Sequence, residues 1–139
     1  MPWFSKQGPA LAFDDSHPDH IIIAEDISQH GHKRYGVFPR ADVDNFTGGP
    51  CNELIRTHCP CRLYFDLDGR DVTHEVVPGF VALVQAKLGR QLPVIVLCSS
   101  NATKFSKHVI FPDVIFQDNW THMRNWVHAF TLELPANTR

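Results

Sequence analysis

The sequence has no apolar run long enough to span a membrane. A membrane-spanning helix needs about 20 consecutive apolar residues, and no segment approaches that length. The N-terminal segment also lacks the basic stretch followed by an apolar core that marks a secretory signal. We therefore expect a soluble, intracellular protein with no membrane partner. The sequence does not distinguish a nucleus, a mitochondrion or a viral replication site.

An excess of positive charge is also missing. The formal net charge is -2, whereas domains that bind nucleic acids are often strongly basic. This balance argues against tight, nonspecific DNA binding by this chain alone. It leaves room for a local basic groove, to which Lys33, Arg34 and Arg40 could contribute.

Cysteines are few, and their spacing does not suggest a structural framework. Cys98 lies in an apolar run, so we expect a buried thiol there and reduced cysteines overall, as in intracellular proteins. Cys51, His58, Cys59 and Cys61 have the residue types of zinc ligands. The single residue between Cys59 and Cys61 is tighter than the usual two to four, so we do not favour a zinc site.

At 139 residues, the chain has the length of a single domain. It shows no repeat, low-complexity segment or linker, and residues 1–20 look irregular. Apolar periodicity and turn residues predict strands at 21–24, 33–38, 62–67, 93–98, 105–111 and 131–134, and helices at 52–56, 73–88 and 119–130. The expected fold class is α/β: an antiparallel or mixed sheet with the helices at 73–88 and 119–130 packed on one face.

Three residues set the expected limits of the central helix. Thr73 is a plausible N-cap, and Gly89 is a natural stop. Pro78 fits only in the first turn, where its missing N–H has no helical acceptor. The helix therefore begins at residue 73 or somewhat later.

Two acidic residues stand at the end of the strand expected at 62–67. Because side chains alternate along a strand, Asp66 and Asp68 should share one face, opposite Leu63 and Phe65. Two carboxylates about 7 Å apart repel each other unless a cation lies nearby. Carboxylate oxygens suit Mg²⁺ or Mn²⁺. The alternative is an ordinary hairpin turn, because Asp-Gly is a common turn signal.

A second strand carries hydrogen-bond donors for phosphate. By the same alternation Lys104, Ser106 and His108 share one face of the strand at 105–111. An ammonium group, a hydroxyl and an imidazole can all donate to the oxygens of a triphosphate. The alternative is an edge strand whose polar groups simply face water. Together with the aspartate pair, the donors favour a site for nucleotidyl transfer.

These motifs resemble the eukaryotic-type primase-polymerases of the archaeo-eukaryotic primase superfamily. The resemblance spans residues 60–130, through CRLYFDLDG (61–69) and SSNATKFSKHVIFPDVIFQDN (99–119). The family's first motif, two acidic residues separated by one, corresponds to Asp66-Leu67-Asp68, with Asp68 where close relatives often have Glu. Its Ser-x-His motif corresponds to Ser106-Lys107-His108. On this basis, residues 1–139 are the N-terminal part of a primase-type catalytic domain.

The resemblance implies a DNA primase-polymerase that uses two divalent metal ions. Asp66 and Asp68 would be the metal ligands, and Lys104, Ser106 and His108 would hold a nucleoside triphosphate. The further partners would be a single-stranded DNA template and a primer. Whether the primers are DNA or RNA, and whether the role is replication or lesion bypass, is left open.

The family's third motif, a hydrophobic residue followed by Asp, has no clear counterpart. Asp113 and Glu133 are the nearest substitutes, and neither is convincing. Three explanations stay open: the chain is a fragment, another segment or chain supplies the third carboxylate, or catalysis has been lost. The rival function is a noncatalytic module of the same fold that binds nucleotide or single-stranded nucleic acid. A weaker rival is a metal-dependent phosphodiesterase.

Overall fold

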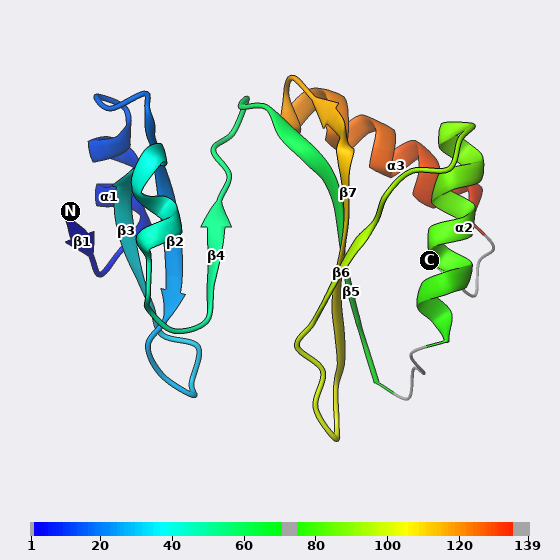
Figure 1. Cartoon of the computed structure of the whole chain (residues 1–139), viewed down its shortest axis with the longest axis horizontal. Helices are drawn as coiled ribbons and strands as arrows, with labels where there is room; N and C mark the ends of the chain where they lie inside the picture. The colour runs from blue at the N-terminus through cyan, green and yellow to red at the C-terminus, as the bar shows by residue number, and fades with distance from the viewer. Residues whose placement is uncertain (1, 71–74, 135–139) are drawn as a thin grey trace. The chain divides into compact units, whose positions relative to one another are not determined.

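The computed structural model describes residues 2–70 and 75–134. The chain forms two compact units, and the boundary falls between Arg56 and Thr57. Each unit has its own antiparallel sheet and its own hydrophobic core (Figure 1). The expected combination of helices with antiparallel strands is therefore confirmed.

The first unit is a four-stranded sheet with one helix. Its elements are β1 (Trp3–Phe4), α1 (Gln7–Asp14), β2 (His20–Asp26), β3 (Lys33–Pro39), the 3-10 helix η1 (Arg40–Asn45) and β4 (Cys51–Leu54). The strand order is β1-β3-β2-β4, and every pairing is antiparallel. Ala10 of α1 packs with Ile22 and Val37, which lie opposite each other on β2 and β3. The strands expected at 21–24 and 33–38 are confirmed.

Two predictions for this unit are wrong. The helix expected at 52–56 is instead the strand β4, which pairs with the free edge of β2. Asn52 and Glu53 have low strand propensity, so tertiary pairing overrides it here. Residues 1–20 are not irregular, because they contain β1 and α1. Pro9 in the first turn of α1, followed by Ala10 and Leu11, was the available helix signal.

The second unit contains both sequence motifs. Its elements are β5 (Cys61–Gly69), α2 (Val76–Leu88), β6 (Ile95–Cys98), β7 (Phe105–Phe116), the π-helical turn η2 (Asn119–Met123) and α3 (Arg124–Glu133). The strand order is β5-β7-β6, and β7 is antiparallel to both neighbours. β5 and β6 are therefore parallel to each other, with α2 between them in sequence. The strands expected at 62–67 and 93–98 are confirmed.

One face of this sheet is covered by helices, as predicted. Figure 1 shows α2 and α3 on the same side of β5, β6 and β7. Leu63 and Phe65 of β5, and Val109 and Phe111 of β7, are buried there. Phe130 of α3 lies 5.9 Å, centroid to centroid, from Phe65. Burying such side chains contributes about 1.5–3 kcal/mol each to the stability of the fold. Because both helices pack on this face, they leave the other face of the sheet open.

The ends of α2 follow from its sequence. Pro78 falls in the first turn, and Gly89 ends the helix with φ of 77°. The Gly89 N–H donates to the carbonyls of Gln85 and Ala86, which glycine achieves without the strain a side chain would add at that φ. The proposed cap, Thr73, lies outside the described residues.

The strand expected at 105–111 does not end at Phe111, before Pro112, because β7 continues to Phe116. The register shifts there, from Leu63 opposite Phe111 to Arg62 opposite Ile115. Pro112 therefore lies in a bulge, where its missing N–H costs no ladder hydrogen bond. Arg62 Nε donates to the Pro112 carbonyl over 3.2 Å.

Two further predictions are corrected near the edges of this unit. Residues 131–134 are not a strand, because α3 runs to Glu133 and places Phe130 and Leu134 together in the core. Cys98 is exposed rather than buried. It lies on β6, which pairs only with β7 in the described sheet. The apolar run around Cys98 predicted a buried strand, but an edge strand can have the same composition.

Candidate functional site

The sheet register brings the two sequence motifs together. On adjacent strands, Asp66 lies directly opposite His108, and Asp68 lies directly opposite Ser106. The residues that alternate with them along the two strands, Leu63, Phe65 and Val109, are buried under the helices. All four motif side chains therefore project from the open face, as the alternation of each strand predicted.

Each carboxylate lies close to a side-chain nitrogen atom. His108 Nε2 lies 3.2 Å from Asp66 Oδ1, and Lys104 Nζ lies 3.6 Å from Asp68 Oδ1. The two aspartate side chains retain 53% and 45% of their exposure, so solvent and ligands can reach them. Exposed pairs of this kind contribute little to stability. Their arrangement is thus better suited to binding than to holding the fold together.

Ser106 differs from its neighbours because it is buried, at 8% exposure. The Ser99 hydroxyl donates a hydrogen bond to Ser106 Oγ over 3.0 Å. Hydrogen bonding from the Ser106 side chain, with the nearby Lys104 charge, lowers the pKa of Asp68. Asp68 is therefore ionised throughout the neutral range. Ser106 links the carboxylate to the turn that follows β6.

That turn is held in place by side chains as well as backbone. Asn101 Oδ1 accepts hydrogen bonds from the backbone N–H groups of Thr103 and Lys104 and from the Thr103 hydroxyl, each within 3.0 Å. The Ser100 hydroxyl bonds both the N–H and the carbonyl of Ser106. Local hydrogen bonds of this type hold a loop in one conformation. The backbone at Lys104 is therefore fixed by the turn.

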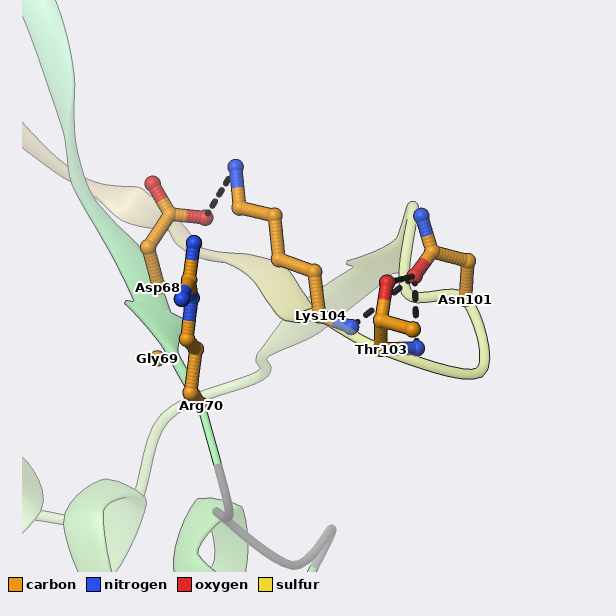
Figure 2. Close-up of a pocket in the computed structure, with 6 residues that line it drawn as sticks. All are labelled: Asp68, Gly69, Arg70, Asn101, Thr103 and Lys104. Atoms are coloured by element: carbon orange, nitrogen blue, oxygen red, sulfur yellow. Dashed lines mark hydrogen bonds and ion pairs between the residues drawn. The ribbon is translucent and has the colours of Figure 1, made fainter.

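A pocket of about 760 Å³ opens between this turn and the end of β5. Its lining residues are Asp68, Gly69, Arg70, Asn101, Thr103 and Lys104. Figure 2 shows the Lys104 side chain reaching toward the Asp68 carboxylate, with the Arg70 side chain extending alongside. Arg70, Asn101 and Thr103 were not predicted as site residues from the sequence. Their positions directly after one motif and directly before the other were the available signal.

The donor set suits a hard divalent cation only in part. Asp66 and Asp68 offer exposed oxygen ligands on one face, as Mg²⁺ and Mn²⁺ prefer. Within residues 2–70 and 75–134, however, no three His, Cys, Asp or Glu side chains are grouped to hold a metal ion. Glu133 pairs with Lys87 of α2 at 2.6 Å, and Asp113 lies in the β7 bulge beyond Phe111. Neither stands beside the aspartate pair in the sheet register.

The cysteine and basic residues singled out in the sequence lie elsewhere. Cys51 belongs to the first unit, whereas Cys59 and Cys61 belong to the second. Cys61 Sγ lies 3.4 Å from Met123 Sδ. In the first unit, Lys33 pairs with Asp26, and Arg34 pairs with Glu25. Two of the three cations considered for a basic groove are therefore already neutralised.

No protein-family model matches this sequence, and a search of curated proteins finds no significant match. None of the helices in the described part of the chain has the length and apolar character that crossing a bilayer requires.

Proposed function

We propose that the open face of the second unit is part of a nucleotidyl-transfer site of the primase-polymerase type. The single observation that carries this proposal is the pairing of the two motifs across β5 and β7. Asp66 opposite His108 and Asp68 opposite Ser106 put potential metal ligands and phosphate donors within contact distance of one another. Nucleotidyl transfer requires both groups at one place.

In this proposal, Asp66 and Asp68 hold the metal ions, and the cations around them hold the phosphates. Mg²⁺ or Mn²⁺ bound there supplies Lewis-acid stabilisation of the attacking and leaving oxygens. Lys104 contributes a point charge and His108 contributes a ring N–H, both from the open face. A hydrogen bond from Ser106 lowers the pKa of Asp68 and so favours its ionised form. The partners would be nucleoside triphosphates, a DNA template and a primer.

The pocket extends the donor set beyond the sequence motifs. Arg70 and Lys104 both line it, together with Asn101 and Thr103 of the turn that follows β6. A guanidinium and an ammonium converging on one cavity favour a polyanionic ligand. This supports a triphosphate rather than an uncharged substrate.

The second candidate is a binding module of the same fold without catalysis. One observation favours it: within the described residues, no third carboxylate joins Asp66 and Asp68. Such a module would bind nucleotide or single-stranded nucleic acid through Lys104, Arg70 and His108. It would need no complete two-metal centre.

Primer extension and primer synthesis with Mn²⁺ or Mg²⁺ test the first candidate, using this chain and any longer natural form. Metal-dependent incorporation that disappears in Asp66→Asn, but not in Asp113→Asn, is the expected result. Asp113 is a suitable control because it is an exposed aspartate on β7. Triphosphate binding without incorporation in either form would favour the binding module. Absence of incorporation, of triphosphate binding and of single-stranded DNA binding would reject both candidates. Cleavage of nucleic acid without any triphosphate would indicate a phosphodiesterase.

A further inference from the structure

The open face of the β5-β7-β6 sheet is polar at one end and apolar at the other. Two residues before Asp66, Tyr64 lies opposite Ile110 of β7, which in turn lies opposite Ile95 of β6. Leu97 of β6 lies opposite His108. Tyr64, Ile95 and Leu97 retain 40%, 45% and 52% exposure. We call Tyr64, Ile95, Leu97 and Ile110 the apolar end.

The apolar end belongs to the same face as the motif side chains. Tyr64, Asp66 and Asp68 alternate with buried Leu63 and Phe65 along β5. An aromatic ring and branched aliphatic side chains thus continue directly from the charged groups.

The change from polar to apolar side chains on this face extends over a defined length of β5. Asp68 and Tyr64 are four positions apart, which corresponds to about 13–14 Å along a strand. Three successive rows cross the sheet over this distance. Asp68 and Ser106 form the first, Asp66, His108 and Leu97 the second, and Tyr64, Ile110 and Ile95 the third. From the first row to the third, the side chains change from polar, through mixed, to apolar.

We propose that the apolar end binds the base and sugar of the same nucleoside triphosphate whose phosphates lie at Lys104, Ser106 and His108. This inference rests on the proposed function and deepens it. An extended nucleoside triphosphate has the same order of groups over a comparable length: phosphates, sugar, then an uncharged planar base. The Tyr64 ring offers the base a stacking surface, as aromatic side chains commonly do in nucleotide and single-strand binding.

Charge complementarity selects this occupant over others. A protein or lipid partner could cover Tyr64, Ile95 and Leu97, but it would also have to match the adjoining carboxylates and Lys104. A nucleotide with a divalent cation on its phosphates meets both requirements, because the cation would neutralise the carboxylates, Lys104 would pair with the phosphates, and the base and sugar are uncharged. The phosphate contacts would fix which end of the ligand reaches Tyr64. Binding by the apolar end would then add affinity without depending on which base is present, because every base has a stackable face.

Calorimetric titration in Mn²⁺ buffer with two ligands tests the proposal: a nucleoside triphosphate and inorganic tripolyphosphate. Tyr64→Ala should weaken nucleoside triphosphate binding by roughly tenfold, a typical contribution of one stacked base. Binding of tripolyphosphate should not change. Tyr64→Phe should retain the affinity, because it keeps the ring. Leu97→Ala is a second variant on the same face, with the same selective loss expected.

Leu83→Ala provides the matched control. Leu83 is an exposed leucine of the same unit, at 46% exposure, but it lies on α2. This variant should bind both ligands as the original chain does. Circular dichroism on every variant separates lost binding from lost folding.

The other possible outcomes distinguish a failure of this inference from a failure of the proposed function. If tripolyphosphate binds through Ser106 and His108 but the nucleoside adds no affinity, or if Tyr64→Ala weakens both ligands equally, the inference is wrong and the proposed function survives. If the original chain binds neither ligand, the proposed function fails and the inference fails with it. If Tyr64→Ala abolishes a concentration-dependent dimer and leaves triphosphate binding intact, the apolar end is a self-association surface instead.

Discussion

Asp66 and His108 lie directly opposite each other on β5 and β7, with 3.2 Å between carboxylate oxygen and imidazole nitrogen. They are 42 positions apart in sequence, and α2 and β6 lie between them in the chain. This pair joins the acidic motif to the donor motif. The proposed function depends on that contact more than on either motif alone.

Replacing Asp66 should remove metal-dependent nucleotide binding while leaving the fold intact. The side chain is 53% exposed, and exposed substitutions usually change stability by less than about 0.5 kcal/mol. We expect Asp66→Asn to lose Mn²⁺-dependent triphosphate binding in a calorimetric titration. Its thermal midpoint should stay near that of the original chain, as should that of Asp113→Asn. Undiminished binding in Asp66→Asn would refute the metal role.

Ser106 and His108 should contribute to triphosphate affinity in different ways. His108→Ala removes a partly exposed donor, so it should weaken triphosphate binding by roughly tenfold, the size of one charge-assisted hydrogen bond. Ser106→Ala should also raise the pKa of Asp68 toward its ordinary value, because the Ser106 hydrogen bond is the largest cause of the lowering. NMR titration of the Asp68 carboxyl in each variant measures this effect. An unchanged Asp68 titration in Ser106→Ala would contradict the assigned link.

Acid should weaken the junction between the 57–60 loop and η2. Asp118 caps η2 by accepting hydrogen bonds from Trp120 and Thr121, and it also pairs with His58 at 2.9 Å. These contacts lower its pKa to about 2. A lowered folded-state pKa stabilises the fold above the unfolded value, near 4, and the stabilisation is lost as pH falls toward 2.

Urea unfolding followed from pH 5 to pH 2 measures this contribution. The original chain should lose more stability over that interval than Asp118→Asn, whose amide does not titrate but can still accept the capping bonds. Asp113→Asn, which replaces an exposed carboxylate outside the cap, should follow the original chain. Parallel curves for the original chain and Asp118→Asn would show that Asp118 does not stabilise the folded state through its charge.

The core beneath the site should be far more sensitive than its exposed edge. Phe111 is fully buried between the sheet and the helices, whereas Ile115 on the same strand is 59% exposed. We expect Phe111→Ala to lower the free energy of unfolding by about 3–5 kcal/mol. Ile115→Ala should change it by about 0.5 kcal/mol or less. Similar losses in both variants, measured by urea denaturation, would mean that β7 is not packed as described.

Gly36 should resist even a small side chain. A Cβ at this position would collide with the Phe38 ring and lie 2.9 Å from the ring of Trp3. Overpacking of this kind typically costs about 1–3 kcal/mol. Gly36→Ala should therefore lower the thermal midpoint. Gly8→Ala should maintain or raise it, because Gly8 lies in α1 with open space around it and alanine favours helix.

The sequence by itself determined the local features of the second unit. Alternation along β5 and β7 assigned Asp66 and Asp68 to one face of their strand, and Ser106 and His108 to one face of theirs, because that period is a property of the strand backbone. Apolar spacing likewise located α2 and its glycine stop. These features depend on neighbours within a few residues, so one sequence contains enough information to predict them.

Only the tertiary structure decided how distant segments meet. The opposition of Asp66 with His108 depends on strand register, and β4 forms because β2 offers a free edge. Pro112 is accommodated by a bulge that the partner strand defines. Exposure of Cys98 follows from the position of β6 at the sheet edge. Each of these outcomes is set by pairing across the sheet, which local propensity does not encode.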